Sequence, residues 1–313
     1  MSKSLCVPKS IPPITVDAMK QMQSRGYSLV EVMIALSLAL LILAGGYHWY
    51  LNLLVQQQRI VQYANIRLRG EAAVNLIAYS ITNTGSWAGL NDLFNEKTLV
   101  GLNQDLCQLA QLPVISDEDG FAAVIEAFAV PSNTSQMGCI GTHTHPLLSG
   151  SPVIQLRELT GPVTTKPDKG VIWQKTQSNG AVNYWAYQSE WFFLVHDGKK
   201  IGLMRLYADA DGVKGATGGV LIQAITQLNM QFGLCSASGE LTWVALSQMD
   251  RQSWVKVRMI HLGLLAQALN PDPSYLNTNQ YTLAGKRVGP FNDHYRRIAF
   301  NQLVALSPGE GPC

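Results

Sequence analysis

The stretch that decides the fold is "GYSLVEVMIALSLALLILA", residues Gly26–Ala44. It is almost entirely apolar, and this character continues, diluted by His48 and Asn52, to Val55. A membrane-spanning helix needs about 20 such residues, so the stretch qualifies as a span. An acid, Glu31, nevertheless lies near its start. A carboxylate costs roughly 2.5–3.5 kcal/mol at the centre of a membrane helix, and less near an end, so Glu31 calls for a partner.

The residues before this stretch set its orientation. Lys9, Lys20 and Arg25 lie upstream of it, and the positive-inside rule therefore predicts a cytoplasmic N-terminus. A cleaved secretory signal peptide is the rival interpretation, with Ala44-Gly45-Gly46 as a poor cleavage site. The first 26 residues are too polar and too long for the n-region of such a peptide, which favours the span.

A cut between Gly26 and Tyr27 would supply the missing partner of Glu31. It would create a new α-ammonium group four residues before Glu31, one helical turn away. The cation and the carboxylate can then pair within one chain or between neighbouring chains packed side by side.

The segment "RGYSLVEVMIALSLALLIL" resembles the class III signal of type IV prepilins. The resemblance implies that prepilin peptidase cuts after Gly26 and N-methylates Tyr27, and that Glu31 registers the subunit against its neighbour in the fibre. Most family members begin with Phe, so Tyr27 is a small departure. An ordinary signal anchor with a chance glutamate is the alternative.

Apolar residues continue at helical spacing beyond the span, with polar residues on the other face. The apolar positions are Ile60, Val61, Ala64, Ile66, Leu68, Ala72, Ala73, Leu76 and Ile77. No proline interrupts this part of the chain, and Asn83-Thr84-Gly85 is a reasonable stop. We therefore predict one helix from Ser28 to about Asn83, roughly 80 Å long. Many major pilins carry a proline where this chain has His48, and Gly45-Gly46 is the expected soft spot instead.

After Gly89 the pattern changes to short alternating runs that predict an antiparallel α+β domain. "VHDGKK" reads as a hairpin turn around Asp197-Gly198. Two polar segments, Thr160–Gly180 and Asn270–Asn279, read as mobile loops. The expected strands are Ala122–Ala129, Pro152–Leu159, Tyr184–Gln188, Trp191–Val195, Ile201–Leu206, Val220–Phe232, Trp254–Ala266 and Arg297–Leu306.

Several blocks of this domain are similar, in order and spacing, to those of PilW-type minor pilins. They are "GSPVIQLREL", "GLMRLYADADG", "GVLIQAITQLNMQFGL", "WVKVRMIHLGLLAQ" and "HYRRIAFNQLVAL". The J pseudopilin of type II secretion shares this design. The resemblance implies a type IV pilin-like fold with four parts: a cytoplasmic leader (1–26), a membrane or pilus-core half of the helix (27–55), an amphipathic half (56–85) and a periplasmic β-rich domain (86–313).

Charge and cysteine content bear on two questions: whether the chain binds nucleic acid and in which compartment its cysteines pair. The 313 residues carry a net charge of +2 without a cluster of Lys or Arg, so nucleic-acid binding gets no electrostatic support. Cys6 precedes the span, whereas Cys107, Cys139, Cys235 and Cys313 follow it and can pair evenly in an oxidising compartment. Sequence proximity suggests Cys107–Cys139 and Cys235–Cys313, although three pairings exist.

Signals for catalysis or metal binding are weak. Hydrolase, Walker A, zincin and C-x-x-C motifs are absent from the sequence, and no cofactor is expected. "GTHTHP" places His143 and His145 on one side of an extended chain, but a third ligand is missing and an exposed loop is favoured. Asp209 and Asp211 in "ADADGVKG" form a weak calcium candidate, with an ordinary Asp-Gly turn preferred.

Three functions follow from these patterns. The first is a non-enzymatic minor pilin that initiates pilus assembly, with twitching motility as its expected setting. Its expected partners are other minor pilins, the major pilin, prepilin peptidase and the inner-membrane assembly platform. The second is a type II secretion pseudopilin, and the third is a signal-anchored periplasmic enzyme or carbohydrate-binding protein. As a minor pilin or a pseudopilin, the chain is expected to lie in the inner membrane with its C-terminal domain in the periplasm.

Overall fold

The structure is a computed structural model, and it describes residues 26–84, 125–132, 134, 140, 144–165, 172–176, 180–209, 212–214, 219–236, 238–250 and 252–306. The chain divides into two compact units, Met1–Gln58 and Arg59–Cys313. The boundary between them falls inside a helix, so each unit takes one part of that helix.

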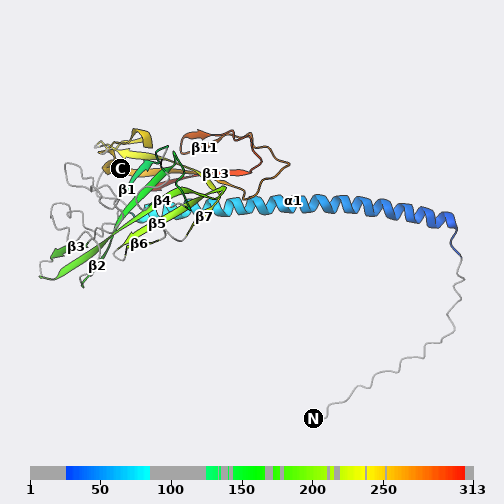
Figure 1. Cartoon of the computed structure of the whole chain (residues 1–313), viewed down its shortest axis with the longest axis horizontal. Helices are drawn as coiled ribbons and strands as arrows, with labels where there is room; N and C mark the ends of the chain where they lie inside the picture. Colours follow the sequence, from blue (N-terminus) through cyan, green and yellow to red (C-terminus); the bar gives the residue numbers. More distant parts are fainter. Residues whose placement is uncertain are drawn as a thin grey trace, which may run out of the picture. The chain divides into compact units, whose positions relative to one another are not determined.

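The helix is α1, Leu29–Asn83, and it runs without interruption for 55 residues (Figure 1). Its first backbone hydrogen bond joins the Val32 amide to the Ser28 carbonyl at 3.1 Å. At its end, the amide and the hydroxyl of Thr84 both donate to the Ser80 carbonyl, at 2.9 and 2.6 Å. The predicted helix is therefore confirmed. It continues through Gly45-Gly46, because the segment contains no proline and the flanking residues are good helix formers.

The larger of the two main β-sheets has seven antiparallel strands in the order β1-β2-β4-β5-β6, with β3 paired to β4 and β7 paired to β5. The predicted hairpin at Asp197-Gly198 is present: Asp197 pairs with Lys200, and Gly198 has the positive φ (+60°) that such a turn requires. The strands are β1 Ile125–Ala129, β2 Pro152–Val163, β3 Ile172–Thr176, β4 Val182–Asp197, β5 Lys200–Asp209, β6 Gly212–Lys214 and β7 Ile222–Gln223.

The second sheet has four antiparallel strands in the order β13-β10-β8-β9. A small hairpin, β11–β12, lies over β10 and β8, where the Asn229 side chain donates to the Leu283 carbonyl at 2.8 Å. The remaining elements are β8 Ile225–Cys235, β9 Leu241–Ala245, β10 Val257–Gln267, β11 Tyr281–Leu283, β12 Lys286–Val288 and β13 Arg297–Ala305, with short 3-10 helices η4 Leu246–Gln248 and η5 Ser253–Lys256.

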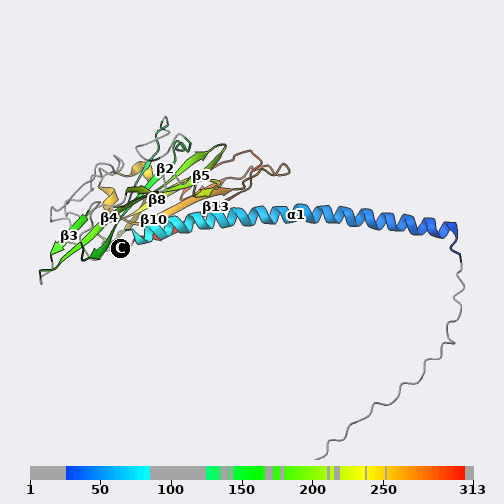
Figure 2. The same ribbon diagram turned by 60° about the horizontal axis from the view of Figure 1, so that its bottom comes forward.

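The main core of the second unit lies where α1 and the two sheets meet. Figure 2 shows the C-terminal part of α1 alongside β10 and β13. Ile66, Ile77 and Ile81 of α1 are fully buried against Leu262 of β10 and other apolar side chains of both sheets. The opposite face of the larger sheet packs a second cluster around Trp191, so this sheet is partly covered on both sides.

Several sequence expectations need correction. The predicted loop Thr160–Gly180 contains the end of β2 and all of β3, which pairs with the first five residues of β4. The runs Tyr184–Gln188 and Trp191–Val195 form one long strand, β4. The run Val220–Phe232 is broken at Ala224, whose φ of +65° interrupts the extended chain between β7 and β8.

The predicted start of β10 is also too early. Trp254 belongs to the 3-10 helix η5, and the strand begins only at Val257. Four short strands, β6, β9, β11 and β12, were also not predicted from the sequence. Their length of three to five residues gives too few alternations for a period-two signal.

Candidate assembly and processing site

The predicted cleavage site lies in accessible chain directly before α1. Gly26 and Tyr27 are exposed, Tyr27 to 81%, and they precede the first helical residue, Leu29. A methyl group at Gly26 would meet no atom of the described chain within 4 Å, so packing among the described residues does not explain a glycine there. Such a segment can enter a protease cleft without prior unfolding.

Glu31 lies in the first turn of α1. The N-terminal end of a helix carries a partial positive charge, which stabilises a carboxylate by about 0.3–1 kcal/mol at exposed sites. Ser28 and Glu31 also have the spacing of a capping box, a local signal that the sequence analysis did not use. A carboxylate at this position thus suits the helix start and suits a cation that follows from cleavage at Gly26.

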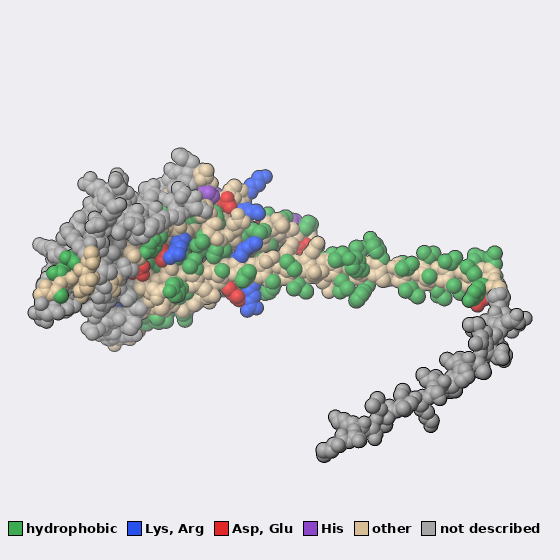
Figure 3. Space-filling view, turned by 90° about the horizontal axis from the view of Figure 1, so that it is seen from below, with side chains coloured by type: hydrophobic (Ala, Val, Ile, Leu, Met, Phe, Trp, Pro, Cys, Tyr) green, Lys and Arg blue, Asp and Glu red, His purple; other side chains and the backbone are tan. Residues whose placement is uncertain are grey.

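The half of α1 within the first unit has no apolar partner inside the described chain. Every residue from Gly26 to Ile60 is exposed, including all the large apolar side chains of the span. Figure 3 shows hydrophobic side chains along the N-terminal part of the helix on the face in view. Among the described residues, α1 is the one helix long and apolar enough to cross a membrane. Lipid or other helices must cover this surface.

The half of α1 within the second unit is apolar on two faces. The buried face carries Ile66, Ala73 and Ile77, in agreement with the predicted packing on the globular domain. Val61 and Leu68 were assigned to the same face, but they are 52% and 67% exposed. They belong to a second stripe at spacings of three, four and seven residues, formed by the exposed residues Val61, Ala64, Leu68, Ala72 and Tyr79.

A cluster of charged side chains joins α1 to the larger sheet near the helix end. Glu190 of β4 forms an ion pair with Arg205 of β5 and accepts a hydrogen bond from the Ser80 hydroxyl. Burial raises the pKa of Glu190, although Arg205 and Ser80 oppose this shift. Burial also raises the pKa of Glu158 on β2, and the negative charge of Glu190 adds to the effect. The sequence analysis missed this cluster, because the three strands pair only in the folded chain.

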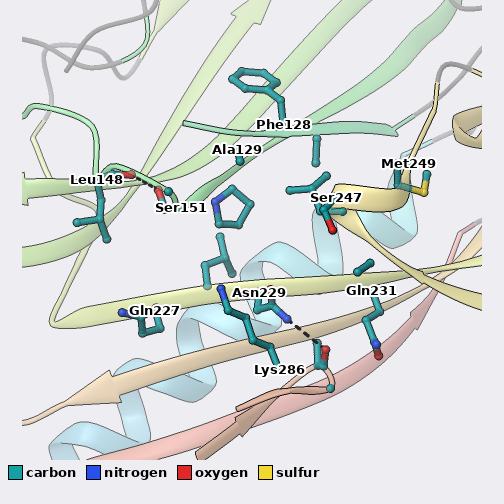
Figure 4. Close-up of a pocket in the computed structure, with 18 of the residues that line it drawn as sticks. Phe128, Ala129, Leu148, Ser151, Gln227, Asn229, Gln231, Ser247, Met249 and Lys286 are labelled. Atoms are coloured by element: carbon teal, nitrogen blue, oxygen red, sulfur yellow. Dashed lines mark hydrogen bonds between the residues drawn. The ribbon is translucent and has the colours of Figure 1, made fainter. Parts of the chain in front are cut away.

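A groove of about 730 Å³ lies between the edge strand β1 and strand β8 (Figure 4). Ser151, Gln227 and Gln231 supply hydroxyl and amide groups, and Leu148 and Met249 supply apolar surface. Among the described residues that line it, Lys286 is the one with an ionisable side chain. The groove can therefore bind polar chains through hydrogen bonds, but its lining lacks an acid–base pair.

The remaining predicted site residues are only partly covered by the described chain. Cys235 is disulfide-bonded, whereas Cys107, Cys139 and Cys313 lie outside the described residues and the pairing stays a prediction. Asp209 is the last residue of β5, and Asp211 lies outside, so the calcium hypothesis is untested.

Of the two histidines considered as metal ligands, the structure describes only His145. His143 lies outside the described residues, and the His145 Nε2 atom is 3.7 Å from Asp197. The described residues contain no group of three or more His, Cys, Asp or Glu side chains arranged for a metal ion.

Comparison with known families gives two matches. Residues 21–47 match the family described as "Prokaryotic N-terminal methylation motif". Residues 192–307 match the family described as "Type IV Pilus-assembly protein W". A solved structure, the type IV-like pilin TTHA1219 from Thermus thermophilus, is 12% identical and aligns over 58% of this chain and 82% of its own, with a TM-score of 0.30. Among curated proteins, none is similar enough to count as a match.

These matches define the class of the protein. A methylation motif that opens a long apolar helix, followed by a β-rich domain, makes the chain a type IV pilin-type protein. The match over residues 192–307, from within β4 to just past β13, then narrows that class: the chain carries a PilW-type domain, which together with the methylation motif indicates a type IV pilus minor pilin.

Proposed function

We propose that this minor pilin helps to initiate pilus assembly and occupies a low-copy position in a priming or tip complex. The observation that carries the proposal is α1 itself. Its N-terminal half is apolar and uncovered, and its C-terminal half is built into the core of a large domain. The first half suits a helical bundle of subunits. The head contains two sheets and would crowd a fibre in which every subunit carried one, which favours a terminal position.

The proposal includes a processing step. Prepilin peptidase cleaves after Gly26 and methylates the new N-terminus at Tyr27, both of which are exposed beside the start of α1. The resulting cation pairs with Glu31 of the same chain or of a neighbouring subunit. The pairing would fix the axial register between subunits, because an unpaired carboxylate is unfavourable among apolar helices.

Before assembly, we place the protein in the bacterial inner membrane, with the leader in the cytoplasm and the second unit in the periplasm. The disulfide at Cys235 supports an oxidising compartment for that unit. Its partners in this state are prepilin peptidase and the assembly platform, followed by other minor pilins and the major pilin. In this proposal the protein is structural and has no enzymatic activity.

A type II secretion pseudopilin of the J type is the second candidate, because it would use the same span, the same cleavage and the same kind of head. The two machines differ in their products. Deletion of the gene should abolish surface pili and leave secretion of exported enzymes intact if the first candidate holds. Loss of secretion with intact pili would select the second.

The processing step has a sharper test in two substitutions. Glu31→Gln should be cleaved normally but be incorporated into sheared pili at about a tenth of the wild-type level or less, since the loss of an ion pair worth about 1.4 kcal/mol or more corresponds to a tenfold change. Ser37→Ala is the matched control, because its hydroxyl only donates to the Ile34 carbonyl within α1. Quantitative immunoblots of sheared pili and membranes measure both. Equal incorporation of Glu31→Gln and wild type would exclude the role given to Glu31.

A further inference from the structure

A small basic depression lies on the first turns of α1 in the second unit. It has a volume of about 450 Å³ and is lined by Arg59, Ile60, Tyr63, Ala64, Arg67 and Arg296. Arg296 directly precedes β13, whereas the other five residues share one face of the helix. Three arginine side chains therefore contribute to the wall of the hollow, together with apolar side chains.

Two of the three arginines are held in place by carboxylates. The Arg67 Nε donates to Glu71 at 2.6 Å. Arg296 donates from Nε and from a terminal nitrogen to one oxygen of Asp272, at 3.1 and 2.8 Å, and its guanidinium lies 4.3 Å from the centre of the Tyr275 ring. A guanidinium has five N–H donors, so each group keeps further donors for a ligand.

The third arginine gives the depression its net charge. Arg59 donates to the Ser274 hydroxyl at 3.1 Å, and no carboxylate within the described part of the chain lies in salt-bridge distance of it. Three arginines face two carboxylates, which leaves one positive charge. A phosphodiester carries one negative charge and several acceptor oxygens, and arginine binds phosphate in forked geometry.

The position of Arg59 along α1 points to the source of that phosphate. Arg59 follows Val55, the last residue of the apolar stretch, by four residues, or about 6 Å of helix. From Leu29 to Val55 the helix is about 40 Å long, which exceeds the 30 Å hydrocarbon core, so a helix that buries this stretch must tilt. Arg59 follows the apolar stretch closely enough in sequence to lie near the lipid headgroups. Ile60 and Tyr63, which are 69% and 56% exposed, suit such an interface.

We propose that the depression formed by Arg59, Arg67 and Arg296 binds the phosphate of an anionic phospholipid headgroup while the subunit waits in the membrane. Ile60 and Ala64 contact the glycerol region, and Tyr63 lies at the interface. The site keeps the head at the membrane surface, and the lipid is released when the subunit enters the fibre. This inference rests on the membrane orientation proposed above.

The test uses the full-length chain in detergent micelles and native mass spectrometry of retained lipid. Phosphatidylglycerol should be retained at least about fivefold better than phosphatidylcholine, and Arg59→Gln should lower its retention about fivefold, the effect expected for one arginine at an anionic surface. Arg59→Gln/Arg67→Gln should remove the preference. Arg59→Lys keeps the charge without the forked geometry and should retain lipid at an intermediate level.

Arg69→Gln is the matched control, since Arg69 lies on the same helix but does not line the depression. It should change retention less than twofold. Equal retention of both lipids by the wild type, or an equal loss in Arg69→Gln and Arg59→Gln, would overturn the site. Displacement of phosphatidylglycerol by inorganic phosphate at matched concentration would show a site for free anions and reject the lipid. Pilus assembly is not read out here, so failure of this inference is separate from failure of the proposed function.

Discussion

The packing of α1 against β13 depends on the absence of a side chain at Gly70. Gly70 is buried on the domain-facing side of the helix, and a methyl group there would overlap the ring of Phe300. Gly70→Ala therefore has two opposing effects. Alanine in a helix interior is favoured over glycine by about 1 kcal/mol, whereas overpacking of a filled site costs about 1–3 kcal/mol. We expect a net loss of up to about 2 kcal/mol in the free energy of unfolding.

Urea unfolding of the fragment Arg59–Cys313, one of the two compact units, measures this loss. Thermal unfolding of the same fragment gives a second readout. Each kcal/mol lost from the free energy of unfolding should lower the melting temperature by about 2–4 °C, as in domains of 150–250 residues. Phe300→Ala provides the decisive background, because it removes the ring that the new methyl group would strike. In that background Gly70→Ala should become neutral or stabilising by up to about 1 kcal/mol. An equal loss in both backgrounds would refute the proposed contact between α1 and β13.

Two further predictions concern the same unit. The hydroxyl of Ser274 and then the guanidinium of Arg296 lower the pKa of Asp272 to about 2, below its ordinary value of 3.8. The stability that the ionised Asp272 gives to the fold is therefore complete above about pH 4 and is lost as the pH falls towards 2. The difference in unfolding free energy between wild type and Asp272→Asn, measured by urea titration across this range, should shrink by about 1–2 kcal/mol; a constant difference would contradict the linkage. Cys235→Ser should lower the free energy of unfolding by about 2–5 kcal/mol under oxidising conditions, and non-reducing peptide mapping of the wild type should find Cys235 linked to Cys313. A link from Cys235 to Cys107 or Cys139 would show that the predicted pairing is wrong.

The helix was predictable because its signal is local and long. From Leu29 to Val55 nearly every residue is apolar, and no proline follows before the end at Asn83. The buried face of its second half was harder to predict, because Ile66 and Leu68 are equally apolar and only the folded domain separates them. Gly70 carries no hydrophobic signal, although it lies at the centre of the contact with Phe300.

The difference between local signals and contacts made only in the folded domain also explains which site residues could be identified from the sequence. Gly26, Tyr27 and Glu31 form a motif within six residues and can be read directly. Arg59 and Ser274 are 215 positions apart, and Arg296 lies farther still, so a chain without an evident Lys/Arg cluster gave no reason to connect them. Glu158, Glu190 and Arg205 likewise meet only through the pairing of β2, β4 and β5.

The two halves of α1 should contribute differently when a subunit leaves the membrane for a fibre. Lipid tails are as apolar as leucine side chains, so replacing lipid with neighbouring helices gives the span of one subunit little hydrophobic gain. Glu31 is the group in the span whose free energy depends most on having a partner, and we expect it to select the register. The part of the exposed stripe from Leu68 to Tyr79 faces water instead, where burial contributes about 25 cal/mol per Å². Substitution of Leu68 by a polar residue should therefore weaken incorporation without altering register, whereas loss of Glu31 should impair both incorporation and register.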